Sequence, residues 1–186
     1  MEKYDITKPV KIPVGMHKLN DDPGISFQLN RLVSMDGCDL SVAREVGSSI
    51  KTAADFYGAL KARADTELEN GRIKNAAALY RMSEFYADWE DPDGLAAWKK
   101  ARELFFQYYA DFFSGERPLV ELVSVPYEGY SMPTLKFNAE APKGVIVMHG
   151  GFDSSYEEFF SECEYLREHG FDVYLFEGPG QGECIR

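Results

Sequence analysis

Two apolar segments, each followed by a glycine-rich loop, constrain the fold of this chain more than any other feature. Residues 144–148 read GVIVM, and residues 171–176 read FDVYLF. A continuous apolar and β-branched run is typical of a strand that is buried on both faces of a parallel sheet. Between the two segments, a capping box of Ser155 and Glu158 begins a helix that Gly170 ends. The pattern predicts a strand–helix–strand unit with parallel strands.

A β-hairpin is predicted to precede this unit. Apolar residues alternate over residues 120–125 and again over residues 130–137, with Glu128 and Gly129 between the two runs. Two alternating runs joined by a short turn that contains glycine are typical of antiparallel strands. The C-terminal part of the sequence therefore predicts an α/β fold.

The N-terminal part has a helical pattern instead. Three helices are predicted, over residues 48–70, 72–89 and 92–113. The third carries seven aromatic residues, which we interpret as core, with the wall of a substrate pocket as the alternative. Gly115 and Pro118 mark the change of pattern. We therefore predict a helical, cap-like region over residues 1–115 and an α/β region over residues 116–186.

Charge and composition exclude several classes of protein. The chain has 20 basic and 31 acidic residues, a formal net charge of −11, which repels nucleic acid phosphates and anionic lipid surfaces. No apolar run approaches the roughly 20 residues of a membrane helix, and the first residues lack the apolar centre of a signal peptide. We expect a cytoplasmic protein with a small-molecule substrate, with neither nucleic acid nor membrane as a partner, and with homodimer formation left open.

The three cysteines indicate reduced, structural thiols. Cys38, Cys163 and Cys184 form an odd set without C-x-x-C spacing. This set predicts neither a disulfide framework nor a zinc site. We expect no metal and no cofactor.

The loop after the first parallel strand is the candidate site. His149, Gly150 and Gly151 follow the strand at the carboxyl edge of the sheet, where open α/β sheets bind their ligands. Backbone N–H groups there can hold the oxyanion of an acyl-transfer reaction, and glycine leaves the approach open and permits positive φ. Residues this close in sequence cannot form a Ser–His–Asp triad. We expect His149 to shape the loop, and Asp153 and Ser154 to cap the helix.

The hairpin, the segment GVIVMHGGFDSSYEEF and the segment VYLFEGPGQGE together resemble the opening of the α/β-hydrolase fold. More narrowly, they are similar to the branch of 2,6-dihydroxypseudooxynicotine hydrolase and the fungal heptaketide-shortening pigment hydrolases, in which a helical region precedes the sheet. The resemblance implies a serine hydrolase that acts, without a cofactor, on an ester or on an activated carbon–carbon bond beside a carbonyl. It implies that the N–H group of Gly151 or Phe152 belongs to the oxyanion hole, and we favour Gly151.

The remaining catalytic groups have no match in the chain. In the family, the nucleophile lies in a G-x-S-x-G elbow on the strand after GPGQGE, and the acid and the histidine follow later. No G-x-S-x-G occurs in residues 1–186. We therefore expect a sheet that is truncated before the nucleophile elbow, an inactive chain, and an open edge on the strand at residues 144–148.

Two other functions stay open. A nucleotide-binding module also has a glycine loop between a buried strand and a helix. Against it, GGFDSS lacks the G-x-G-x-x-G pattern, and no such loop precedes Glu177 by about 20 residues. The other alternative is a non-catalytic helical interaction module with a vestigial hydrolase half.

Overall fold

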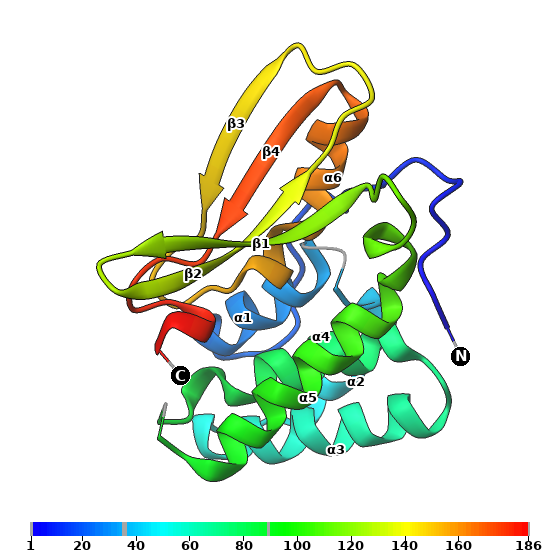
Figure 1. Cartoon of the computed structure of the whole chain (residues 1–186). Helices are drawn as coiled ribbons and strands as arrows, with labels where there is room; N and C mark the ends of the chain where they lie inside the picture. Colours follow the sequence, from blue (N-terminus) through cyan, green and yellow to red (C-terminus); the bar gives the residue numbers. More distant parts are fainter. Residues whose placement is uncertain (1, 35–36, 89, 186) are drawn as a thin grey trace. The chain divides into compact units, whose positions relative to one another are not determined.

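The computed structural model describes residues 2–34, 37–88 and 90–185, and the chain forms two compact units (Figure 1). The first unit consists of Met1–Tyr4 and Ile12–Tyr109, and the second of Asp5–Lys11 and Ala110–Arg186. The domain boundary expected after residue 115 stays a prediction.

The first unit is helical. Its helices are α1 (Pro23–Ser34), α2 (Leu40–Ser49), α3 (Phe56–Glu69), α4 (Ile73–Ser83) and α5 (Pro92–Tyr108). α4 packs against both α3 and α5, as Figure 1 shows. Leu29 of α1, Leu60 of α3 and Leu79 of α4 are fully buried, so apolar faces from three helices meet in one core.

The helix predicted over residues 48–70 is wrong at its start. α2 ends at Ser49, and the chain is extended at Ile50 before α3 begins. A capping box of Thr52 and Asp55 begins a short 3-10 helix that leads into α3. This local start signal divides the predicted helix in two, and α1 together with most of α2 was missing from the prediction.

The other two predicted helices form but are shorter. α4 ends at Ser83 and continues as a 3-10 helix to Tyr86, whereas Trp89, the predicted end, lies outside the described residues. α5 begins as predicted, because the Asp91 side chain accepts a hydrogen bond from the N–H group of Asp93 at 3.1 Å. It ends at Tyr108 instead of residue 113.

Among the residues that the structure describes, four strands form the sheet of the second unit. They are β1 (Val120–Tyr127), β2 (Tyr130–Phe137), β3 (Gly144–His149) and β4 (Phe171–Phe176). The order is β1-β2-β4-β3, with β3 parallel to β4 and the other pairs antiparallel. Glu128 and Gly129 form the hairpin turn with φ of 45° and 85°. The predicted hairpin, parallel pair and open β3 edge are confirmed.

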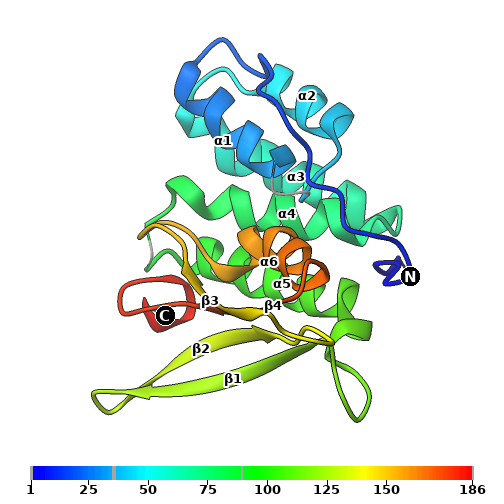
Figure 2. The same cartoon turned by 90° about the horizontal axis from the view of Figure 1, so that it is seen from above.

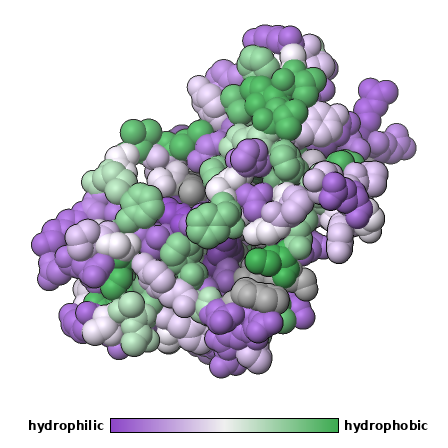
Figure 3. All heavy atoms as spheres, turned by 90° about the vertical axis from the view of Figure 1, so that its left-hand side faces the viewer, coloured by the Kyte–Doolittle hydropathy of each residue, from purple (hydrophilic) through white to green (hydrophobic). Residues whose placement is uncertain are grey.

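β3 is exposed on one face, contrary to the expectation that it is buried on both. Val145 and Val147 are 62% and 68% exposed. The space-filling view of Figure 3 shows apolar side chains gathered in the upper region, where Figure 1 draws β3. An apolar run shows that a strand can be buried on both faces. Whether it is buried also depends on other elements that cover each face.

Helix α6 (Phe160–Glu168) covers one face of this sheet (Figures 1 and 2). The ring of Phe160 lies 5.1 Å from the ring of Phe112 and 5.1 Å from that of Phe137 on β2, measured between centroids. All three rings are buried. Aromatic packing therefore joins α6, β2 and the 3-10 helix Ala110–Phe113.

The aromatic residues of the predicted third helix are mostly core. Trp98, Phe105, Tyr109 and Phe112 are buried, and the other three are half-buried. The burial favours the core interpretation, and a pocket wall stays a prediction.

Across the part of the chain that the structure describes, no helix combines the length and the apolar character needed to cross a lipid bilayer.

All three cysteines are free thiols. Burial raises the pKa of Cys38 to about 12, so this thiol stays protonated and unreactive at neutral pH.

Candidate functional site

Two glycine loops leave the sheet side by side at the carboxyl ends of β3 and β4. The strands are parallel, and His149 at the end of β3 is paired with Phe176 at the end of β4. Gly150 and Gly151 follow the first strand, and Glu177 follows the second and directly precedes the GPGQGE segment. The register therefore brings the two quoted motifs to one edge.

The side chain of Gln181 joins the two loops. Its Nε2 atom donates to the carbonyl oxygen of Gly150 at 2.9 Å and to that of Gly151 at 2.6 Å. Its Oε1 atom accepts from the N–H group of Gly178 at 2.9 Å. One amide group thus ties the loop after β4 to two successive carbonyls of the loop after β3.

A second link is made by Glu177, whose side chain is almost fully buried. Its carboxylate accepts from the N–H group of Tyr156 at 3.1 Å and from that of Glu183 at 2.8 Å. The first bond reaches the helical segment that follows the β3 loop, and the second closes the GPGQGE segment on itself. A buried carboxylate needs such donors to offset its lost hydration.

Residues of the β3 loop supply further donors to the same carbonyls. Ser154 donates to the carbonyl oxygen of Gly151 through its N–H group at 3.2 Å and through its Oγ atom at 2.8 Å. His149 Nδ1 lies 2.7 Å from the carbonyl oxygen of Gly150, a contact that fits the prediction that His149 shapes the loop. Each of the two carbonyls therefore accepts from a side chain close to it in sequence as well as from Gln181.

Capping of the following helix differs from expectation. The N-cap is Ser155, which forms the predicted capping box with Glu158 and begins the 3-10 helix Tyr156–Phe159 that leads into α6. Asp153 is not the N-cap, and Ser154 uses its hydroxyl to hold the carbonyl of the preceding loop. Serine satisfies whichever nearby backbone group lacks a partner, and here that group lies before the helix.

Space requires a glycine at position 150 of the β3 loop, and backbone conformation requires one at neither position 150 nor position 151. Neither Gly150 nor Gly151 has a positive φ. A Cβ atom at position 150 would overlap with the Oγ atom of Ser154 and would lie 2.7 Å from the ring of Phe159. At position 151 it would meet only Asp153, at 3.2 Å. The expectation of positive φ is therefore wrong, whereas close approach explains Gly150.

The N–H groups of Gly151 and Phe152 are the open donors of this loop. Within the described residues, neither N–H group donates a hydrogen bond to the chain. The Phe152 side chain is 88% exposed. Two neighbouring N–H donors that are not used by the protein can bind an anionic oxygen. The sequence prediction singled out these two residues, and their role stays a prediction.

Sequence reasoning missed Gln181 and Glu177 as parts of this site. Both occur in the segment VYLFEGPGQGE that carried the family resemblance, yet neither was given a role. The only available signal was a long polar side chain between glycines directly after a buried strand. No group of three or more His, Cys, Asp or Glu side chains that could hold a metal ion occurs among the described residues.

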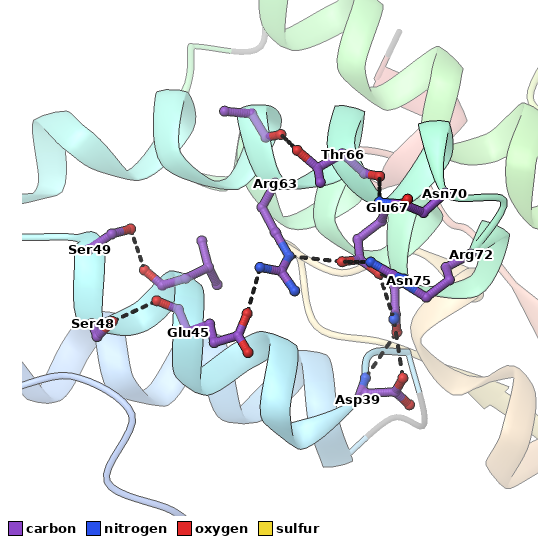
Figure 4. A network of polar contacts seen from close by, with 12 residues as sticks. Asp39, Glu45, Ser48, Ser49, Arg63, Thr66, Glu67, Asn70, Arg72 and Asn75 are labelled. Atoms are coloured by element: carbon purple, nitrogen blue, oxygen red, sulfur yellow. Dashed lines mark hydrogen bonds and ion pairs between the residues drawn. The ribbon is translucent and has the colours of Figure 1, made fainter.

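A second polar cluster, in the helical unit, is structural. Figure 4 shows the carboxylate of Glu67 facing Arg63, Arg72 and Asn75, with Asn75 also bonded to Asp39. Glu67 is fully buried, and the hydrogen bond from Arg72 is the largest cause that lowers its pKa to about 2. Because protein groups satisfy this carboxylate, it joins α2, α3 and α4 and is not a site for chemistry.

Comparison with known proteins shows which proteins the chain is similar to. No protein-family model matches it. It is 31% identical over 142 residues to "Hydrolase acrC" of Aspergillus aculeatus, covering 66% of this chain and 32% of that protein. It is 32% identical over 118 residues to "20-hydroxy-prefusarin hydrolase FUS2" of Gibberella moniliformis, covering 60% of this chain and 28% of that protein.

The fold is also similar to that of a solved structure, AbyA5. The two superpose with a TM-score of 0.66 at 18% sequence identity, over 89% of this chain and 46% of AbyA5. The chain thus spans less than a third of the length of the two fungal relatives and less than half of AbyA5. By sequence, the chain therefore resembles part of these fungal hydrolases, in agreement with the α/β-hydrolase branch that its motifs indicate, and its fold is similar to that of AbyA5.

Proposed function

We propose that this chain is the N-terminal part of a serine hydrolase and that the N–H groups of Gly151 and Phe152 belong to its oxyanion hole. The observation that carries the proposal is the pair of unused N–H donors at the carboxyl end of β3. The hydrolase relatives support the reaction class. The cap-like helical region and the first half of the sheet are the parts that the chain supplies.

The proposed substrates are small molecules with an ester or with an activated carbon–carbon bond beside a carbonyl. Both reactions begin when the serine oxygen adds to the carbonyl carbon, whose oxygen becomes an anion. Two N–H donors stabilise that anion more than the neutral carbonyl, which lowers the barrier. No cofactor takes part in the proposed reaction.

The nucleophile, the acid and the base are proposed to lie outside residues 1–186. The chain contains no G-x-S-x-G elbow, and its relatives are more than three times as long as the region that they share with it. We therefore propose that the chain alone has no hydrolase turnover. Its three free cysteines support a reducing, cytoplasmic location.

Binding of a nucleotide phosphate at this loop is disfavoured by carboxylates. Phosphates bind at a helix N-terminus through unused N–H groups. Here the N–H group of Tyr156 donates to Glu177 and that of Ser155 donates to Glu158, so two acidic side chains already occupy this position. Their negative charge would also repel a phosphate.

A fluorophosphonate probe, which labels activated serines, tests the proposal. We expect the 186-residue chain to remain unlabelled and the protein translated from the complete reading frame to be labelled at one serine. The Gly151→Pro variant of the complete protein, which removes one donor, should be labelled more slowly. Labelling of the 186-residue chain at a serine, or no labelling of the complete protein, would contradict the proposal.

A further inference from the structure

We propose that Gln181 is a positioning residue that sets the direction of both candidate oxyanion donors. Its amide group fixes two successive peptide planes, and the N–H groups of those planes belong to Gly151 and Phe152. This inference rests on the proposed function, because a direction matters only if the two donors bind the reacting oxygen.

The geometry follows from the planarity of the peptide bond. The carbonyl of Gly150 shares a plane with the N–H group of Gly151, and the carbonyl of Gly151 shares one with the N–H group of Phe152. In a trans peptide the carbonyl and the N–H group point in opposite directions. Gln181 Nε2 donates to both carbonyls, at 2.9 and 2.6 Å. Both N–H groups are therefore directed away from Gln181, toward the same side.

Two successive carbonyls that face one point repel each other unless a donor stands between them. A primary amide has two N–H bonds on one nitrogen, so it can serve both carbonyls at once. Ser154 and His149 also bond these oxygens, but Ser154 lies in the β3 loop and His149 ends the strand directly before it. Among the described residues, Gln181 is the donor to these two carbonyls that comes from outside this loop.

Gln181 is itself held in place relative to β4. Its Oε1 atom accepts from the N–H group of Gly178, and its own N–H group donates to the carbonyl of Gly178 at 3.0 Å. The neighbouring Gly182 lies against the buried carboxylate of Glu177. The Gln181 amide therefore fixes the position of the β3 loop relative to the end of β4.

Two substitutions separate donation from a merely structural role. Gln181→Glu keeps an oxygen that can accept from Gly178 and loses both donors, whereas Gln181→Met loses the acceptor and the donors. If Gln181 only holds its own turn, Gln181→Glu behaves like the unchanged chain. If donation matters, both variants lose the hydrogen bonds that hold the carbonyls of Gly150 and Gly151 to the loop after β4. Glu140→Gln is the control, because Glu140 is exposed and lies in the same unit.

The first measurement is NMR relaxation of the labelled 186-residue chain. We expect order parameters near 0.85 for the N–H groups of Gly151 and Phe152 in the unchanged chain and in the control, and values below about 0.6 in both Gln181 variants. The carbonyl carbon shifts of Gly150 and Gly151 should change with them. Rigid N–H groups and unchanged shifts in Gln181→Glu would overturn the proposal, and so would the same result in Gln181→Met.

The second measurement is turnover of an ester by the complete protein. Misdirected donors weaken contacts that form only in the transition state, so we expect kcat to fall about 10- to 100-fold with KM almost unchanged. A normal kcat in a Gln181 variant with mobile N–H groups would overturn the role of Gln181 in turnover. If Gly151→Pro and Phe152→Pro variants also kept full turnover, the assignment of these two N–H groups to the oxyanion hole would fail. Failure of the proposed function can thus be told apart from failure of the positioning role of Gln181.

Discussion

Gly182 lies so close to the carboxylate of Glu177 that a Cβ atom at position 182 would come well within 3.0 Å of it, a separation that real Cβ atoms do not show. The carboxylate cannot move aside, because it is buried and bonded to the N–H groups of Tyr156 and Glu183. The absence of a side chain at Gly182 therefore leaves room for the Glu177 carboxylate, which in turn holds the helical segment after the β3 loop.

Replacement of Gly182 by alanine should destabilise the protein more than replacement of Gly180. Both glycines have positive φ, 42° and 84°, so each alanine has a conformational cost of about 1 kcal/mol. Only Gly182→Ala adds overlap with Glu177, at about 1–3 kcal/mol more. Urea unfolding measures both values, and equal losses for the two variants would contradict the packing argument.

Gly150 and Gly151 should respond differently to alanine. A Cβ atom at position 150 overlaps with Ser154 and approaches the ring of Phe159, whereas one at position 151 meets only the end of the Asp153 side chain. We expect Gly150→Ala to lower the free energy of unfolding by about 1–3 kcal/mol, and Gly151→Ala to change it by less than about 1 kcal/mol. Thermal unfolding of both variants checks the difference. The reverse order would show that the loop packs differently.

The charge of Glu67 should stabilise the helical unit at neutral pH. Its pKa is about 2 in the folded chain and 4.5 in an exposed glutamate, so the stabilisation is complete above about pH 4.5 and is lost as the pH falls toward 2. The shift corresponds to about 3 kcal/mol. Glu67→Gln should therefore be less stable at pH 7 by roughly this amount, and its stability should fall less between pH 4.5 and pH 2.

Glu69→Gln is the matched control for Glu67, two residues further along the same helix and exposed. It should leave the unfolding free energy within about 0.5 kcal/mol of the unchanged chain at each pH. An equal effect of the two substitutions would contradict the assigned role of the buried carboxylate.

The exposed face of β3 should make the chain prone to association. Val145 and Val147 are more than half exposed on a strand that, within the described residues, is paired on one side only. Lysine at both positions should raise the concentration at which light scattering begins, without a lower unfolding midpoint. Val173→Lys, at a fully buried position of β4, should unfold the second unit. Unchanged association of the double variant would exclude this face as its cause.

The local features of the sheet could be predicted from the sequence because they depend on neighbouring residues. Three of these features are each encoded by residues within a few positions of one another: the capping box at Ser155, the hairpin turn at Gly129 and the start of α5 at Asp91. A capping box of Thr52 and Asp55 is a local signal of the same kind. Had it been recognised, the helix predicted over residues 48–70 would have been divided in two.

The long-range features could not be predicted in the same way. The bond from Gln181 to Gly150 joins residues 31 positions apart, and it exists only because the register of β3 and β4 brings their ends together. The exposure of Val145 depends on which elements cover the sheet, which hydropathy does not encode. The family resemblance could thus name candidate donors, but the bonds between the two loops could not be predicted from the sequence.

Removal of one candidate donor is the direct test of the loop's chemistry. Proline at position 151 has no N–H group, so Gly151→Pro in the complete protein should lower kcat by about 10² to 10³ if Gly151 stabilises the oxyanion. The Gly144→Ala variant is the control, because Gly144 begins the same strand and a Cβ atom there makes only ordinary contacts with Phe171. Thermal unfolding must show that both variants are folded. Full turnover in a folded Gly151→Pro protein would exclude this donor and leave the N–H group of Phe152 as the candidate, which Phe152→Pro then tests in the same assay.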